Sequence, residues 1–317
     1  IFNGKSSSDP FIGKYCGNTI PPSVVSTSKF LYVTFHTDHS QTRTGFNATY
    51  GQIERPHIEP STSPYSVIQG RQIRLACFPN QLIPSIGYIW HKNGVQIATQ
   101  SVYRVNSAER SDSGNYTCSF GPGTTSTPIQ VDVLYPPTVS TPSTYQVIES
   151  TDLTLQCTAT ANPGNINYRW TGPGNLDYTG SSLTISNIVK AKTGVYTCTA
   201  TNMMTPTTGP QEIGRGTSTT NVTVLYGPTV TISPDDITKI LEHIDHRLTC
   251  TVQSNPTPTI FTWYLPNGTS IPGDRELVIS KRDQGGIYRC EADTTLVPTD
   301  GSSITMSNST TINITVL

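Results

Sequence analysis

Charged side chains are scarce in this sequence. Asp, Glu, Lys and Arg make up 13% of its 317 residues, against about 25% in an average globular protein. The 20 basic and 21 acidic residues leave a net charge of −1, so no long-range field attracts a phosphate backbone or an anionic membrane surface. We therefore expect no nucleic-acid partner.

Long apolar segments are also missing. No run of about 18 apolar residues is present, so we expect no membrane-spanning segment in this fragment. Residues Ile1–Gly4 lack the basic start and the apolar run of a signal peptide. If the protein is exported, the sequence is expected to be a mature fragment.

Patterns of catalytic residues are absent as well. The sequence has no GxSxG, no GxGxxG after a strand, and no motif of paired carboxylates. Two HxxH spacings occur, at His36–His39 and His243–His246, but residues three apart on a strand point to opposite faces. We expect a protein that is not an enzyme and requires no cofactor.

Turn-forming and hydroxyl residues are what the chain has in abundance. It contains 25 Gly, 24 Pro and 15 Tyr together with many Ser and Thr, a composition typical of secreted all-β proteins rather than helical ones. At roughly 100–200 residues per domain, the length indicates two to four domains.

Seven cysteines are spaced in a way that repeats along the chain. Six form three neighbouring pairs whose members lie 41, 41 and 40 residues apart, and Cys16 stands alone. In each pair a Trp follows the first Cys by 13 residues, a Tyr precedes the second Cys by two, and a Gly precedes that Tyr by two. The three sets are Cys77, Trp90, Gly114, Tyr116 and Cys118, then Cys157, Trp170, Gly194, Tyr196 and Cys198, then Cys250, Trp263, Gly286, Tyr288 and Cys290.

This arrangement resembles the immunoglobulin superfamily, and the short segment before residues 101–105 is similar to its I-set or C2-set type. The resemblance implies two packed sheets, a disulfide joining the two Cys of each pair, a Trp packed on the sulfurs, and a Tyr bonded back to the preceding turn. A zinc site is the alternative, but CxxC or nearby His ligands are lacking. The Asp common in the family six residues before the second Cys is replaced by Lys192 and Gln284, so a salt bridge from that position is in doubt there.

The repeat also has a period. Val133–Val139 recurs at Val224–Val230, 91 residues later, and Asn221–Leu225 recurs at Asn313–Leu317, 92 residues later. Each copy is expected to run from the last strand of one domain straight into the next domain, so we expect a semi-rigid rod. One local pattern disagrees, because helical spacing relates four apolar residues just before Cys250, where the resemblance places strands. We expect strands there, with a helical turn as the alternative; the four are Ile237, Ile240, Leu241 and Ile244.

Residues 1–50 resemble the C-terminal half of a CUB domain. The matching features are the Cys-Gly of Tyr15–Asn18, Pro21–Pro22, the alternating apolar segment Leu31–Ser40, and Gly45–Tyr50. The resemblance implies that Cys16 pairs with a Cys about twenty residues upstream, before residue 1; a free or intermolecular thiol is the alternative. It also implies that Asp38, with carbonyls near Ser40, binds Ca²⁺, which needs about six to eight oxygens; a solvated loop Asp is the alternative.

The expected architecture is therefore all-β, a partial CUB sandwich followed by three immunoglobulin-like sandwiches. The expected boundaries are 1–52 for the CUB part and 53–135, 136–226 and 227–317 for the three domains.

Six Asn residues lie in N-x-[S/T] sequons and are predicted to carry N-linked glycans. Asn115 is favoured by strand alternation, because Tyr116 and Cys118 are expected to point inward. Asn221 and Asn313 are expected on matching faces of the last strands of their domains. The six are Asn47, Asn115, Asn221, Asn267, Asn308 and Asn313.

The region after the second Cys is longer in the later repeats. From that Cys to the last Leu of the repeat there are 16 residues in the first and 27 in each of the other two, so the F–G hairpins are expected to be long. The Asp-Gly in the third is a strong hairpin turn signal. A contact site and a longer hairpin without a partner remain the two alternatives, and exposed methionines would favour contact. The candidate contact residues are Met203, Met204, Arg215, Asp300 and Gly301.

Three hypotheses of function follow. The first is a segment of an extracellular or cell-surface glycoprotein that acts in adhesion or recognition, binding a protein or glycan ligand or copies of itself. The second is a structural repeat or spacer of an extracellular fibre or matrix, and the third is an accessory region of a CUB-bearing extracellular enzyme. All three hypotheses are drawn from the domain architecture, and this fold alone is compatible with many functions.

Overall fold

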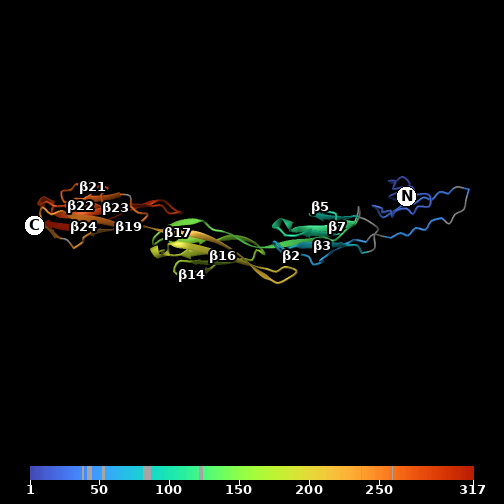
Figure 1. Cartoon of the computed structure of the whole chain (residues 1–317), viewed down its shortest axis with the longest axis horizontal. Helices are drawn as coiled ribbons and strands as arrows, with labels where there is room; N and C mark the ends of the chain where they lie inside the picture. The colour runs from blue at the N-terminus through green and yellow to red at the C-terminus, as the bar shows by residue number, and fades with distance from the viewer. Residues whose placement is uncertain are drawn as a thin grey trace. The chain divides into compact units, whose positions relative to one another are not determined.

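The computed structural model describes residues 1–37, 39–40, 45–51, 54–80, 87–120, 124–236, 238–258 and 260–317 (Figure 1). The chain divides into two compact units, one made of residues 1–135 with 203–213 and the other of residues 136–202 with 214–317. Regular structure in the described residues is almost entirely β-strand, and the only helical elements there are short 3₁₀ turns. None of them is long and apolar enough to cross a bilayer. The prediction of an all-β chain is confirmed.

The first fifty residues form little regular structure. In their described part, Phe2 makes isolated bridges to Tyr32 and Phe11, and the first named strand begins only at His57. The strand expected within Leu31–Ser40 is not formed in that part, because a strand needs paired neighbours and these residues supply few. Many large apolar side chains of this segment, such as Phe35 and Phe46, stay exposed.

The first immunoglobulin-like domain packs two antiparallel sheets around one core. One sheet has the order β1-β3-β6, and the other continues from β5 through β4 and β7 to β9, with β2 parallel to β9. The bounds are β1 His57–Glu59, β2 Tyr65–Ile68, β3 Ile73–Phe78, β4 Tyr88–Lys92, β5 Val95–Ala98, β6 Val102–Val105, the 3₁₀ turn η1 Arg110–Asp112, β7 Gly114–Phe120, β8 Thr124–Thr125 and β9 Ile129–Ser140.

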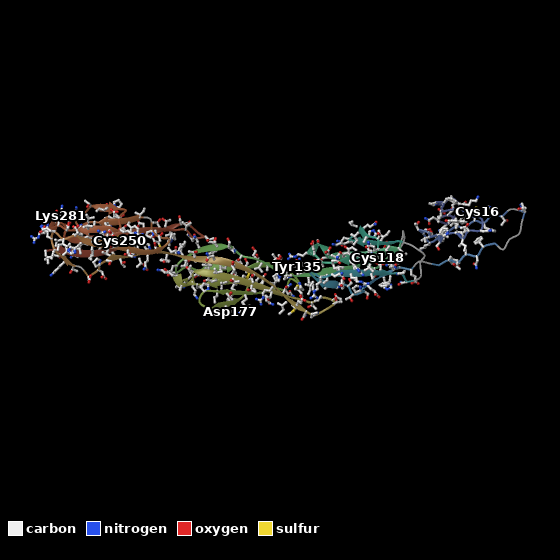
Figure 2. All side chains as sticks on the ribbon, viewed as in Figure 1. Cys16, Cys118, Tyr135, Asp177, Cys250 and Lys281 are labelled. Carbon is white, nitrogen blue, oxygen red and sulfur yellow. A yellow bond between two sulfur atoms is a disulfide. The ribbon has the colours of Figure 1, made fainter. Side chains whose placement is uncertain are left out.

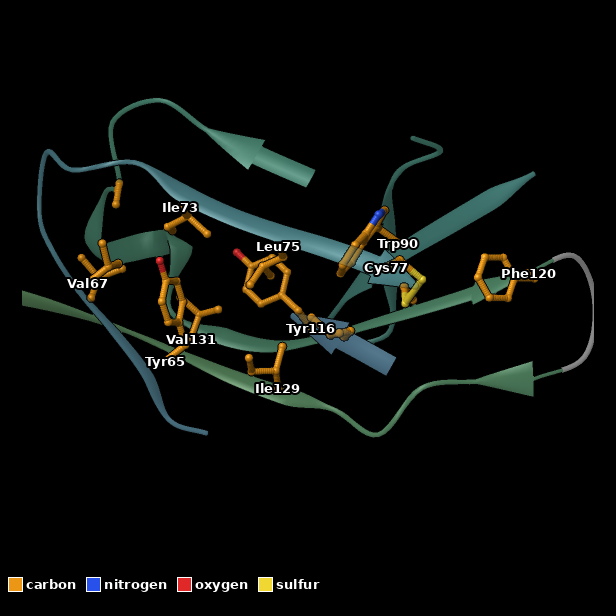
Figure 3. Close-up of a cluster of buried hydrophobic side chains, with 14 residues drawn as sticks. Tyr65, Val67, Ile73, Leu75, Cys77, Trp90, Tyr116, Phe120, Ile129 and Val131 are labelled. Atoms are coloured by element: carbon orange, nitrogen blue, oxygen red, sulfur yellow. A yellow bond between two sulfur atoms is a disulfide. The ribbon is translucent and has the colours of Figure 1, made fainter. Parts of the chain in front are cut away.

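Strand alternation builds the core of this domain. On β7, Tyr116 and Cys118 are buried while Asn115 is exposed, as period-two side-chain direction requires. Figure 3 shows Tyr116 and Leu75 within this core and Trp90 beside the disulfide of Cys77.

The second domain repeats this plan. Its sheets are β11-β15 and β14-β13-β16-β17, and β10 is parallel to β17. Leu153, Leu155 and Trp170 are fully buried in its core. The bounds are β10 Thr144–Ile148, β11 Leu153–Gln156, β12 Thr158–Asn162, β13 Asn167–Gly172, β14 Leu176–Thr179, β15 Ser182–Ile185, η2 Lys190–Lys192, β16 Gly194–Met204 and β17 Glu212–Ser233.

The third domain shares strand β17 with the second. This strand pairs with β10 through residues 221–225 and with β19 through residues 226–233, so no free linker separates the two domains. The bounds are β18 Lys239–Ile240, β19 His246–Asn255, β20 Ile260–Tyr264, β21 Ser270–Pro272, β22 Glu276–Ile279, η3 Arg282–Gln284, β23 Gly286–Leu296 and β24 Ile304–Val316.

Residues 238–245 contain no helix. Ile240 lies on strand β18, parallel to β24, and is buried, whereas Leu241 and Ile244 are exposed. Tertiary pairing to β24 therefore outweighs the local helical spacing; Ile237 lies outside the described residues.

Candidate contact site at the F–G hairpins

A covalent and hydrogen-bonded frame holds each immunoglobulin-like domain. Disulfides cross between the sheets, and the Trp of each domain is fully buried. The structure joins Cys77 to Cys118, Cys157 to Cys198 and Cys250 to Cys290.

The second part of this frame is a tyrosine bonded to the 3₁₀ turn before its strand. The Tyr116 hydroxyl donates to the Asp112 carbonyl at 2.8 Å, and the Tyr196 hydroxyl donates to the Lys192 carbonyl at 2.9 Å. Because the acceptor is a backbone carbonyl, loss of the Asp side chain in the second domain leaves this bond in place. Burial raises the pKa of Tyr196 and of Tyr288 above the ordinary value, since a buried phenolate is poorly solvated.

The tip of the second domain's F–G hairpin belongs to the compact unit that contains the first domain. Residues 203–213 pack with residues 1–135. Met204 is only 4% exposed and forms an apolar cluster with Ile68 and Leu134, whereas Met203 is 48% exposed. The two methionines thus differ in exposure. Met204 packs within the chain and is not accessible to an external partner, whereas Met203 faces solvent.

Polar contacts fix this tip in register. The backbone N–H of Thr207 donates to the Ser66 carbonyl at 2.8 Å, and the N–H of Ser66 donates to the Thr207 hydroxyl, also at 2.8 Å. The Arg71 guanidinium donates to the Glu212 carboxylate. Thr207 of the hairpin therefore pairs with the outer edge of strand β2, as a peptide does when it adds a strand to a sheet.

The third domain's hairpin docks on the second domain in the same way. The N–H of Thr299 donates to the Gln146 carbonyl at 2.9 Å, and the N–H of Gln146 donates to the Thr299 hydroxyl at 2.7 Å. The Tyr145 hydroxyl donates to the Asp300 carboxylate. Burial, with this carboxylate beside it, raises the pKa of Tyr145 to about 12. Leu296, at the position of Met204, is fully buried.

The residues that form these two contacts share a sequence pattern. The donor hairpins carry Met204-Thr205-Pro206-Thr207 and Leu296-Val297-Pro298-Thr299, a large apolar residue followed by any residue, Pro and Thr. The acceptor strands carry Tyr65-Ser66-Val67-Ile68 and Tyr145-Gln146-Val147-Ile148. Both patterns recur in the printed sequence, but only the structure shows that one binds the other.

The remaining candidate contact residues lie at the surface. Arg215 and Asp300 are exposed, and Gly301 is exposed with a φ of +100°, a conformation that favours glycine. The Asp-Gly pair thus lies in the turn of the third hairpin.

The side chains of the six sequon Asn residues are all exposed. In Asn267 the side-chain oxygen accepts from the Thr269 N–H at 3.0 Å and from its hydroxyl at 2.7 Å. In Asn308 the amide nitrogen, the atom that a glycan would modify, donates to the Pro228 carbonyl at 2.9 Å. The last contact ties β24 to the start of the third domain and competes with modification.

Two predicted sites lie in the N-terminal segment. Cys16, which is expected to lack its partner in this fragment, is exposed and unpaired; Figure 2 marks its position. Asp38 lies outside the described residues, and no group of three or more His, Cys, Asp or Glu that could hold a metal ion occurs in the described part of the chain.

Comparison with known families finds immunoglobulin and CUB domains. The models described as immunoglobulin domain match residues 136–202, 227–293 and 55–133, together more than half of the chain. The model described as CUB domain matches residues 1–50.

Individual relatives are much longer than this chain. Hemicentin-1 of Homo sapiens is 30% identical over 265 residues, which is 75% of this chain but 4% of that protein. Cubilin of Canis lupus familiaris is 38% identical over 56 residues, 18% of this chain and 2% of that protein. Among solved structures, a complex of Dpr2 with DIP-Theta immunoglobulin domains covers 83% of this chain and 100% of that chain, with 19% identity and a TM-score of 0.46.

Proposed function

Because this chain belongs to the immunoglobulin superfamily and carries a CUB segment at its N-terminal side, we propose that it acts as a structural spacer and adhesive segment of an extracellular glycoprotein. Three disulfides suit an oxidising, extracellular or cell-surface setting. Relatives such as hemicentin-1 support an adhesion or matrix protein without enzymatic activity.

The observation that carries the spacer role is the use of both long F–G hairpins inside the chain. Loops at the ends of a sandwich commonly supply its binding surface. Here Met204 and Leu296 are buried. Thr207 and Thr299 each use the backbone N–H and the side-chain hydroxyl in hydrogen bonds to a strand of the neighbouring domain. Such hairpins serve the linkage of domains rather than capture of a ligand.

A domain replacement tests the spacer role. In the parent glycoprotein, residues 53–317 are replaced by three immunoglobulin domains of unrelated sequence and equal length, or are deleted. Replacement should preserve deposition of the secreted protein into matrix, and deletion should reduce it. If replacement impairs deposition as much as deletion does, the role of this chain is recognition by its own surfaces.

A recognition role is the second candidate, and one observation favours it. The outer face of the second hairpin carries Met203 and Ile213, both exposed. The positions 92 residues later hold Thr295 and Thr305, which face each other in register. An exposed apolar pair therefore occurs where the other hairpin has hydroxyls, and exposed apolar pairs serve as contact points for protein partners. Met203→Asp should abolish aggregation of beads coated with the chain if this pair is adhesive, and Thr295→Asp is the matched control.

Modification and metal binding remain further proposals. We propose N-linked glycans on the exposed sequons, with Asn115 and Asn267 the best presented, and a Ca²⁺ ligand role for Asp38 as the CUB resemblance implies. Calorimetric titration of the chain with Ca²⁺, compared with Asp38→Asn, tests the metal proposal, and equal weak binding by both would refute it.

A further inference from the structure

We infer that the third immunoglobulin domain carries a vacant acceptor for an F–G hairpin of the same kind, formed by Lys239, Leu241 and Leu317. The equivalence comes from the last strand of each domain. Gln69, Glu149 and Glu242 each donate a backbone N–H to the final Leu of their domain. The residues just before them are therefore equivalent in the three domains.

The apolar part of the acceptor is covered in the first domain and open in the third. Ile68 and Leu134 are 6% and 3% exposed, because Met204 of the docked hairpin packs on them. Their equivalents Leu241 and Leu317 are 56% and 53% exposed. Two large aliphatic side chains, each directly after the end of strand β18 or β24, thus face solvent at the place where the hairpin sits in the first domain.

The backbone part of the acceptor is also in place. The N–H groups of Thr315 and Leu317 donate to the carbonyls of Thr238 and Ile240, so β24 uses the residues on either side of Lys239. The N–H and carbonyl of Lys239 then point to the outer edge of β18. Ser66 and Gln146, at the same position, use those two groups to bind Thr207 and Thr299.

One difference between the acceptors defines the occupant. Ile244 stands at the position of Arg71, which pairs with Glu212 in the first domain. An apolar residue in place of that Glu would complement Ile244, whereas a carboxylate there would have no cation to pair with. The third domain's own hairpin has this chemistry, because Ile304 follows Leu296 by eight residues, as Glu212 follows Met204. The occupant is thus a hairpin with a four-residue sequence: a large apolar residue, any residue, Pro and Thr. A second apolar residue follows eight positions after the large apolar one.

A second copy of this chain is a poor occupant. Its two long hairpins are already docked through Met204 and Leu296, and detaching one would expose that side chain. The acceptor fits the hairpin of a further immunoglobulin domain joined after Leu317. The inference depends on the docking geometry and not on the spacer role, so either can fail alone.

The test extends the full chain with a second copy of residues 226–317 placed directly after Leu317, so that Tyr226 follows Leu317 as it follows Leu225. Hydrogen exchange of the Lys239 amide is measured by NMR in the natural and extended chains. We expect exchange at least about tenfold slower in the extended chain, since its added hairpin supplies an acceptor for this N–H. Leu241→Asp in the extended chain should restore fast exchange. Ile260→Asp is the matched control. Ile260 is 53% exposed, close to the 56% of Leu241, and it pairs with Asp293 of β23, at the end of the domain away from the acceptor.

Each result decides the inference. Unchanged exchange at Lys239 on extension, or protection that persists with Leu241→Asp, would overturn it. A concentration-dependent dimer of the natural chain that Leu241→Asp abolishes would also overturn it, by assigning the surface to a second copy. Near-ultraviolet circular dichroism checks the fold: the spectrum of the natural chain with Leu241→Asp should match that of the natural chain.

Discussion

Replacing Met204 with alanine should weaken docking of the second domain's F–G hairpin on the first domain while leaving both domains folded. Met→Ala in a core costs about 2–5 kcal/mol. The cluster here contains only Met204, Ile68 and Leu134, so the neighbours relax and the cost falls near the lower limit. At about 1.4 kcal/mol per tenfold, a loss of about 2 kcal/mol raises the undocking equilibrium about 30-fold.

Hydrogen exchange reports this change directly. The amides of Ser66 and Thr207 are hydrogen-bonded only across the docked contact, so in Met204→Ala both should exchange about 30-fold faster when exchange follows the opening equilibrium. Met203→Ala is the control, because Met203 is exposed and lies next to Met204 in the same hairpin. Rates in Met204→Ala within about threefold of those in Met203→Ala would refute the assignment of docking energy to the buried side chain.

The other predictions concern the frame and the glycans. Peptide mapping without reduction should recover each of the three intradomain disulfides, and a bridge between domains would contradict the domain boundaries. Tyr196→Phe should lower the free energy of unfolding by about 1 kcal/mol in urea titrations, since it removes the bond to the Lys192 carbonyl, and an unchanged midpoint would argue against that bond. Because burial raises the pKa of Tyr196 and Tyr288, the unfolded state loses the phenol proton first, so stability should hold below about pH 10 and decline as pH rises above it; a flat profile from pH 9 to 11 would contradict this. Glycopeptide mass spectrometry should find higher occupancy at Asn267 than at Asn308, whose amide nitrogen is bonded to Pro228, and the reverse order would be evidence against this competition.

Much of the fold could be predicted because its determinants are local in the repeat. Cys, Trp and Tyr at constant spacing specify which strands face each other across a core, and the buried Trp and bonded Tyr of each domain follow that pattern. Local patterns are less informative where neighbouring strands determine the structure. The apolar spacing around Ile240 alone indicates a helix, whereas the repeat predicts a strand, and pairing of Ile240 with Val316 agrees with the repeat. Residues 31–37 have the alternation of a strand but find few partners among the described residues.

The repeated spacing of Cys, Trp and Tyr, with the family resemblance that it carries, was enough to predict three sandwiches with a disulfide each, because these residues act within one domain. The spacing also located the lengthened hairpins. The role of those hairpins became visible only in the folded chain. Whether Met204 is a ligand-binding residue or an internal contact depends on Ile68 and Leu134, more than 60 residues away in sequence. That proximity is created by folding of the neighbouring domain, and no local pattern encodes it.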